Sequence, residues 1–362
     1  MQKLCTKKED YNPQVYLEKF KTALTIDENY APALYELYYY YFYTDVAYAK
    51  EYLDKYEQVA EKSIELDYMK TDLLFVSQKY TEAISGANAI MAKAGTDVKP
   101  RIYKLLAYSQ AYLGDSASAL KNMNTYFEKQ IDTSIVAKDF ELKAKLLETL
   151  NQDKSLAIEW YKKALAAEED KKEKIGYMAS LAEIQKELGN REREAAWRES
   201  IFNAKEKPTN LDIYKWGMAL YSDENYAKAD SVFAIYAIKY PEQIHGYLWR
   251  AKCNALIDTA RTMGIAVPHY IKLAEVAAGI DAEKNKAVIL RAYNYLGIYE
   301  ANITKNYPVS LGYFEKMLAI DPENADGQKF SGILKGWIEK AKTEDSNTGN
   351  ESASDAATGS GK

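Results

Sequence analysis

The chain has 362 residues, of which 47% are hydrophobic and 28% charged, and its formal net charge is −5. This length exceeds the roughly 250–300 residues at which single cores stop growing, so the sequence predicts several domains or an elongated repeat array. The sequence contains no stretch of about 20 apolar residues, so it predicts no membrane span. It also contains no basic stripe of the kind expected in a protein that binds nucleic acid.

The N-terminal part of the sequence predicts a loose segment at residues 1–11, followed by a first helix at about residues 12–26. This helix has the pattern of the second half of a helical hairpin, but no first half precedes it. The pattern favours missing upstream sequence, including a trimmed export signal.

Residues 38–43 hold five tyrosines and one phenylalanine. Four consecutive tyrosines span about 300° of a helix, and a helix that is bulky all round usually packs all round. Tyrosine suits such a position because its ring can be buried while its hydroxyl reaches water or a carbonyl. The run therefore favours packing, with contact between one or two of these rings and a ligand as the alternative. Both interpretations can hold for different residues of the run.

The clearest repeated unit covers residues 211–243, where two short amphipathic helices flank the polar turn SDEN. Small residues at Gly217 and Ala229 mark the predicted helix crossing, and Pro241 closes the unit. Similar second helices, each ending in an acidic or proline turn, are expected at residues 20–29, 60–67, 161–170, 271–285 and 314–324. Four prolines fall where helices are expected to start, namely Pro32, Pro100, Pro268 and Pro308.

The sequence resembles the tetratricopeptide repeat (TPR) family over nearly its whole length. The resemblance rests on Tyr226 and Ala229, three residues apart at the start of a second helix, and on the turn Gly114–Asp115. It also rests on the distance in sequence between successive second helices, which is near the roughly 34 residues of that helix–turn–helix repeat. It implies an all-α, right-handed superhelical α-solenoid and a bacterial source. About eight repeats would occupy residues 12–325, the first of them incomplete.

The C-terminal part of the sequence predicts a capping helix and a tail. Residues 326–342 place Phe330, Leu334 and Trp337 on one stripe, as a helix covering the last repeat requires. Residues 343–362 have no aromatic side chain and several acidic ones, and we expect a disordered acidic tail there.

The concave groove of a TPR solenoid, by family resemblance, holds a peptide or a partner protein. Some members grip a C-terminal carboxylate there, but this sequence does not show that clamp. Helical phase predicts a mixed aromatic and basic groove lined by Arg101, Lys104, Tyr108, Tyr112, Tyr214, Tyr221, Lys252 and Asn294.

The sequence offers no constellation for catalysis. His245 and His269 are the only histidines, and no metal-binding or phosphate-binding motif is complete. We therefore expect a non-enzymatic protein–protein interaction scaffold with no cofactor and no metal. The alternatives are a glycan-binding or small-ligand-binding accessory protein of the bacterial cell envelope and, least favoured, an enzyme. Oligomeric state stays open, and the periplasm is slightly favoured over the cytoplasm.

Overall fold

The computed structural model describes the backbone of residues 13–131, 134–151 and 153–357, and side chains as far as Thr343. The predicted loose segment 1–11 lies outside the described residues. The described part of the chain is helical and contains no strand. It divides into two compact units, residues 1–169 and 170–362, which are described one at a time.

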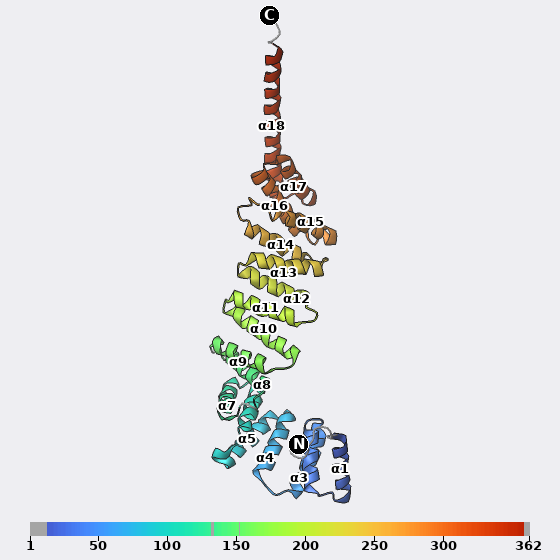
Figure 1. Ribbon diagram of the computed structural model, residues 1–362, viewed down its shortest axis with the longest axis vertical. Helices are drawn as coiled ribbons and strands as arrows, with labels where there is room; N and C mark the ends of the chain where they lie inside the picture. Colours follow the sequence, from blue (N-terminus) through green and yellow to red (C-terminus); the bar gives the residue numbers. More distant parts are fainter. Residues whose placement is uncertain (1–12, 132–133, 152, 358–362) are drawn as a thin grey trace. The chain divides into compact units, whose positions relative to one another are not determined.

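The first unit is a succession of helices joined by short turns (Figure 1). Its helices are α1 (Pro13–Ile26), α2 (Ala31–Phe42), α3 (Val46–Val59), α4 (Ile64–Val76), α5 (Tyr80–Ala94), the 3₁₀ helix η1 (Gly95–Asp97), α6 (Arg101–Tyr112), α7 (Ser116–Lys129), α8 (Ala137–Thr149) and α9 (Lys154–Ala167).

The second unit continues the same pattern. Its helices are α10 (Lys171–Glu187), α11 (Arg191–Ala204), α12 (Asn210–Ser222), α13 (Tyr226–Lys239), α14 (Ile244–Ile257), α15 (Val267–Asp281), α16 (Lys286–Tyr299), the π-helix η3 (Glu300–Thr304), α17 (Tyr307–Ile320) and α18 (Ala325–Ala357).

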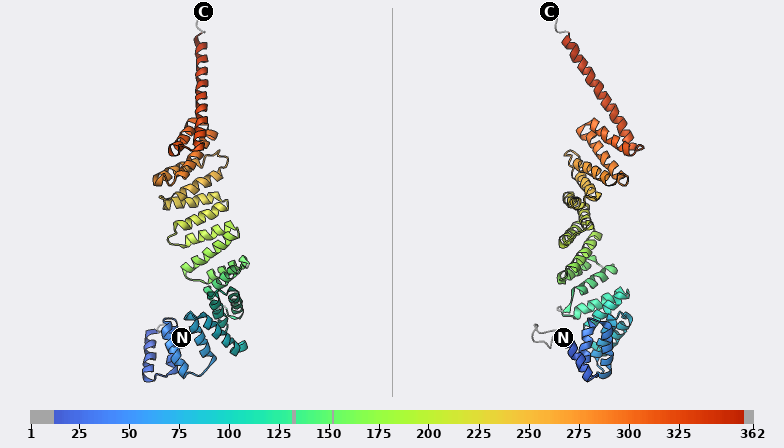
Figure 2. Two further views of the ribbon diagram at one scale, coloured as in Figure 1. Left: turned by 180° about the vertical axis from the view of Figure 1, so that it is seen from behind. Right: turned by 90° about the vertical axis from the view of Figure 1, so that its right-hand side faces the viewer.

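Consecutive helices pack as antiparallel hairpins within each unit (Figure 2). An even-numbered first helix packs on the odd-numbered second helix that follows it, from α2–α3 to α8–α9 and from α10–α11 to α16–α17. The prediction of an all-α solenoid built from helical hairpins is confirmed.

The turn inside several hairpins has one recurring design. A residue with positive φ ends the first helix, as at Gly114 (φ +84°), Glu224 (φ +58°) and Lys305 (φ +59°). The Asp or Asn that follows then caps the second helix, because its side chain accepts a hydrogen bond from a backbone N–H of the first turn. The prolines predicted at helix starts lie at the N-cap of α6 and in the first turns of α2, α15 and α17.

Small residues allow the two helices of a hairpin to approach closely. A Cβ atom added to Gly217 on α12 would lie 2.6 Å from Cζ of Phe233 on α13, and one added to Gly297 on α16 would lie 2.7 Å from Cε2 of Phe314 on α17. Ala229 on α13 is completely buried. The crossing predicted at Gly217 and Ala229 is confirmed.

The prediction of a second helix at residues 60–67 is wrong. Helix α3 already ends at Val59, and the next first helix, α4, begins at Ile64. Ser63 is the N-cap of α4, and its hydroxyl accepts a hydrogen bond from the Leu66 N–H at 3.3 Å. A serine at this position therefore starts a helix rather than packing inside one.

The C-terminal helix α18 packs on α17 through its apolar stripe. Phe330 lies 5.0 Å from Phe314 between ring centroids, and Leu334 is buried. The backbone of α18 continues as helix to Ala357, beyond the point where the sequence predicts a disordered tail to begin. The boundaries proposed for the array, the cap and the tail remain predictions.

Among the described helices, none combines the length and apolarity needed to cross a membrane.

Candidate functional site

A pocket of about 410 Å³ lies between the first helices of three successive hairpins in the first unit. We call it the N-terminal pocket. Helix α2 with its C-cap, helix α4 and helix α6 supply the lining residues Tyr38, Tyr39, Phe42, Tyr43, Asp72, Phe75, Val76, Arg101, Lys104, Leu105, Tyr108 and Tyr112. All three are first helices of their hairpins.

Helix α6 gives the pocket one continuous face. Its residues Arg101, Lys104, Tyr108 and Tyr112 recur at helical spacing and point to the same side. All four were predicted as groove residues from helical phase, and the structure brings them together here. Tyr112 is 64% exposed, and its ring stacks on Tyr80 with centroids 4.6 Å apart and planes 10° apart.

Arg101 is held by acidic side chains of α4. Its Nη1 lies 2.6 Å from Oδ2 of Asp72, and its Nη2 lies 3.4 Å from Oε1 of Glu65. The guanidinium also sits 4.7 Å from the centroid of the Tyr68 ring. The guanidinium charge is therefore largely compensated within the protein. Its buried Nε atom has no hydrogen-bond partner among the described residues.

Lys104 and Tyr108 both reach a carboxylate on α8. Asp139 is completely buried, and its oxygens lie 2.8 and 2.9 Å from Lys104 Nζ. The Tyr108 hydroxyl donates to Asp139 Oδ1 at 3.0 Å, and the Tyr126 hydroxyl and the Val136 N–H donate to Oδ2. Burial, reinforced by the charge of Asp139, raises the pKa of Tyr108. These bonds fix the α6 wall of the pocket.

Burial also raises the pKa of Asp72 to about 6, even though the neighbouring Arg101 favours the charged form. Asp72 lines the pocket and lies 2.6 Å from the guanidinium. Protonation of this carboxyl near pH 6 would therefore weaken one of the two ion pairs that occupy Arg101.

The tyrosine run supplies the opposite wall of the pocket and also packs inside the unit. Tyr38 is buried, and its hydroxyl donates to the carbonyl of Met69 at 3.0 Å. Tyr41 is partly buried and stacks on Tyr52, with ring centroids 5.4 Å apart. Tyr39, Phe42 and Tyr43 line the pocket, and Tyr43 is 81% exposed. Five of the six side chains are therefore buried or partly buried, and only Tyr43 is largely exposed. Those that line the pocket come from both ends of the run.

The pocket continues along the unit toward α8. A second hollow of about 490 Å³ shares Tyr108 and Tyr112 with it and is bordered by Lys138, Glu141 and Lys145. Glu141 lies 2.9 Å from Lys138 and 2.6 Å from Lys145, so these charges are also paired within the protein. Aromatic side chains thus line both hollows, and the lysine and arginine side chains at their borders are paired with acidic neighbours.

The predicted residues in the second unit gather mainly around one indole. The ring centroids of Tyr221 and Tyr214 lie 4.9 and 6.4 Å from that of Trp249. Lys252 Nζ lies 4.1 Å from the centroid of the Trp249 ring. Burial, followed by the charge of Arg291, lowers the pKa of Lys252. Asn294 lies on α16 with a buried Oδ1 that has no hydrogen-bond partner among the described residues.

Sequence reasoning missed the part of the N-terminal pocket that α4 provides and the central place of Trp249. Phe75 on α4 lies 5.8 Å from Tyr80 and 6.4 Å from Tyr108, between ring centroids. Asp72 is followed by Phe75 and Val76 at i+3 and i+4, and this same-face spacing was the available signal. In the described side chains, no group of His, Cys, Asp and Glu is placed to hold a metal ion.

Comparison with known proteins gives similarity to solved structures only, since no protein-family model matches the sequence and no curated protein does. The chain is similar to the C-terminal part of a TPR repeat-containing protein from Cytophaga hutchinsonii, with 30% identity over 72% of this chain and 98% of that chain, at a TM-score of 0.45. It is also similar to the TPR2AB domain of yeast Sti1 in a complex with pHSP90, with 18% identity over 77% of this chain and 98% of that chain, at a TM-score of 0.39. A tetratricopeptide repeat protein from Parabacteroides merdae shares 14% identity over 75% of this chain and 98% of that chain, at a TM-score of 0.38.

Proposed function

We propose that this chain, which belongs to the tetratricopeptide repeat family, is a non-enzymatic scaffold that binds a segment of a partner protein in its N-terminal pocket. Membership of the family follows from the 30% identity that it shares with the Cytophaga hutchinsonii protein over nearly all of that chain. The fold is of the kind that serves as a protein-interaction scaffold.

The observation that carries the proposal is the aromatic pocket between α2, α4 and α6. Tyr39, Phe42, Tyr43, Phe75 and Tyr112 surround a space of about 410 Å³. Aromatic side chains dominate the binding energy of many interfaces because they bury large apolar areas at a small cost in conformational entropy. A pocket of this kind fits a large apolar or aromatic side chain of an extended or helical segment.

The charges of the pocket argue against a ligand recognised mainly through a carboxylate. Arg101 and Lys104 each lie within 3 Å of a carboxylate oxygen of the protein itself, at Asp72 and Asp139. A ligand carboxylate would have to compete with these contacts. We therefore propose that ring contacts supply most of the affinity and that the basic side chains orient the ligand.

A pull-down with paired variants tests this function. The bait variant Tyr43→Ala/Tyr112→Ala removes the two most exposed rings of the pocket, and Tyr30→Ala/Tyr48→Ala removes two exposed rings elsewhere in the same unit. We expect the wild-type chain and the second variant to capture the same protein from a lysate of the organism that makes the chain, and the first variant to lose it. Equal capture by all three would contradict the proposal.

A second candidate function is glycan or small-ligand binding in the cell envelope. The stacked pair Tyr80 and Tyr112 favours it, because an exposed ring held flat against its neighbour could stack on a sugar. A glycan array probed with the wild-type chain and with Tyr43→Ala/Tyr112→Ala separates the two functions. Binding that disappears in the variant supports the glycan alternative, and its absence from the wild-type chain rejects that alternative.

A bacterial source and a periplasmic location complete the proposed setting. Both remain proposals based on the resemblance described above. Fractionation of the native cells, followed by detection of the chain with an antibody, tests the location directly.

A further inference from the structure

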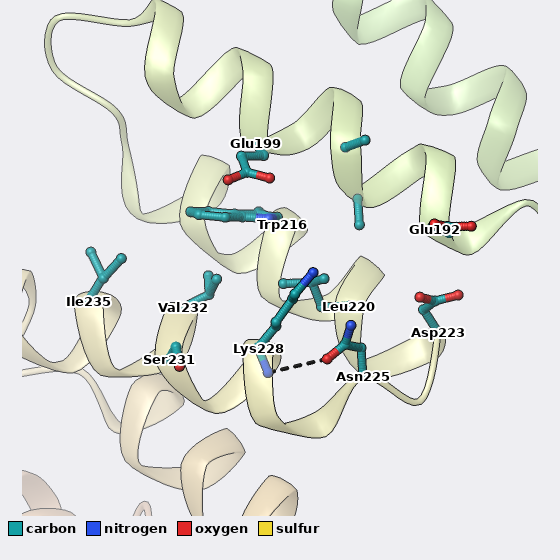
Figure 3. A pocket seen from close by; sticks show the side chains of 12 residues that line it. Glu192, Glu199, Trp216, Leu220, Asp223, Asn225, Lys228, Ser231, Val232 and Ile235 are labelled. Carbon is teal, nitrogen blue, oxygen red and sulfur yellow. Dashed lines mark hydrogen bonds between the residues drawn. The ribbon is translucent and has the colours of Figure 1, made fainter.

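A second pocket of about 410 Å³ lies entirely within the second unit, between the second helices α11 and α13 (Figure 3). We call it the tryptophan pocket. Its lining residues are Glu192, Ala195, Ala196, Glu199, Trp216, Leu220, Asp223, Asn225, Lys228, Ser231, Val232 and Ile235. None of them was predicted as a binding residue.

Helix α12 contributes to this pocket with the side that faces away from its tyrosines. Trp216 and Leu220, with the C-cap Asp223, follow at intervals of four and three residues and line the pocket. Tyr214 and Tyr221 lie on the opposite side of the helix, where they pack toward Trp249. The tryptophan pocket is therefore separate from the groove positions that the sequence predicts in this unit.

The base of the tryptophan pocket is apolar. Trp216 is partly buried and packs against Phe202, with ring centroids 5.2 Å apart. Leu220, Val232 and Ala195 are buried beside it in the core of the α12–α13 hairpin. A flat indole bordered by aliphatic side chains can accept the methylene stem of a long side chain.

The rim of the tryptophan pocket is acidic. Figure 3 shows the carboxylate of Glu199 next to the Trp216 ring, and those of Glu192 and Asp223 near one another at the other end. No ion pair of these three side chains, or of the Lys228 ammonium, occurs among the described residues. The rim thus carries three carboxylates against one ammonium, whereas the basic groups of the N-terminal pocket are already compensated.

We propose that the tryptophan pocket docks a lysine or arginine side chain carried by an apolar segment of a protein partner. The stem of that side chain would lie on Trp216, Leu220 and Val232, and its cationic head would reach the carboxylates of the rim. Charge complementarity selects this occupant, because an acidic segment would meet three carboxylates against a single ammonium, whereas a cation gains from both the carboxylates and the indole face. The proposal is independent of the function assigned to the N-terminal pocket.

The test measures binding of a fluorescent peptide to the full chain at low ionic strength. The probe is an acetylated and amidated Leu-Lys-Leu-Lys-Leu peptide, and its reference is the same peptide with Glu in place of Lys. We expect fluorescence anisotropy to show binding of the lysine peptide only. The triple variant Glu192→Gln/Glu199→Gln/Asp223→Asn should weaken that binding at least fivefold, and added salt should weaken it further.

Two matched controls keep the result specific. Glu242→Gln/Glu283→Gln/Glu323→Gln removes three exposed carboxylates of the same unit outside the pocket and should change the affinity less than twofold. Lys228→Gln removes the competing cation of the pocket and should strengthen binding about two- to threefold. Stronger binding by Lys228→Gln supports the proposal whether or not the triple variant folds. Circular dichroism checks the folding of the triple variant.

The proposal is overturned if the lysine peptide does not bind, if both peptides bind equally, or if the triple variant and its control lose the same affinity. Unchanged affinity in Lys228→Gln would also count against it. Tyr43→Ala/Tyr112→Ala should bind the lysine peptide as the wild-type chain does, so a failure here is distinguishable from a failure of the function proposed for the N-terminal pocket.

Discussion

At the scale of single residues, the charges of the N-terminal pocket are set by acidic partners that lie far away in the sequence. Lys104 on α6 pairs with Asp139 on α8, and Arg101 pairs with Asp72 on α4. The sequence predicted the two basic residues from local helical phase. It could not predict their partners, because these contacts depend on how one hairpin packs against the next.

Asp72 should make stability depend on pH. Its pKa is about 6 in the folded chain, against about 3.9 for an unfolded aspartate, so between these values the folded state keeps a proton that the unfolded state has released. Rising pH through this window therefore destabilises the fold, by up to about 2–3 kcal/mol at 1.36 kcal/mol per pKa unit. We expect the urea midpoint of the wild-type chain to fall from pH 4 to pH 7 relative to that of Asp72→Asn. Parallel profiles would show that the pKa of Asp72 is not raised.

Gly189 should be required for the turn between α10 and α11. Its φ is +75°, and nothing lies within 4 Å of an added Cβ, so alanine there would meet backbone strain alone. We expect Gly189→Ala to cost about 1–2 kcal/mol, seen as a lower urea midpoint. The control Gly176→Ala, in the open interior of α10, should raise the midpoint, because alanine is favoured over glycine in helices by about 1 kcal/mol. Equal shifts in both variants would contradict this account of the turn.

At the scale of helices and hairpins, the sequence predicted the order of elements well because its signals are local. Prolines at helix starts and small residues at crossings act within one hairpin, and the structure places both as expected. The error at residues 60–67 arose because the segment was expected to lie inside one helix, whereas Ser63 in its middle caps the start of α4. Cap and core positions both suit small side chains, so only the contacts of Ser63 decide between them.

Ala229 should tolerate no larger side chain. It is completely buried where α12 and α13 cross, so Ala229→Leu should overpack the crossing and cost about 1–3 kcal/mol. Ala227 lies two residues earlier on the same helix and is exposed, which makes Ala227→Leu the matched control with little expected effect. Urea titration followed by circular dichroism compares the two. Similar destabilisation in both variants would contradict the hairpin packing.

At the scale of the whole molecule, two units of the same architecture contain pockets of different chemistry. The N-terminal pocket of the first unit is aromatic with compensated charges, and the tryptophan pocket of the second unit is apolar with an acidic rim. The sequence predicted the α6 side of the N-terminal pocket. It did not predict the tryptophan pocket, because the position of Trp216 on its helix favours packing against the core. The acidic rim becomes visible only when α11 and α13 are placed beside that ring.

The central claim, that the N-terminal pocket holds a segment of a partner protein, is tested most directly by site-specific photocrosslinking. The photoreactive residue p-benzoylphenylalanine would replace Tyr112 in the pocket or, as a control, the exposed Tyr48 on α3, in the full chain. After irradiation in native lysate, mass spectrometry identifies the adducts. We predict a covalent adduct with one protein at position 112 and none with that protein at position 48. Absence of any protein adduct at position 112, or the same adducts at both positions, would contradict the claim.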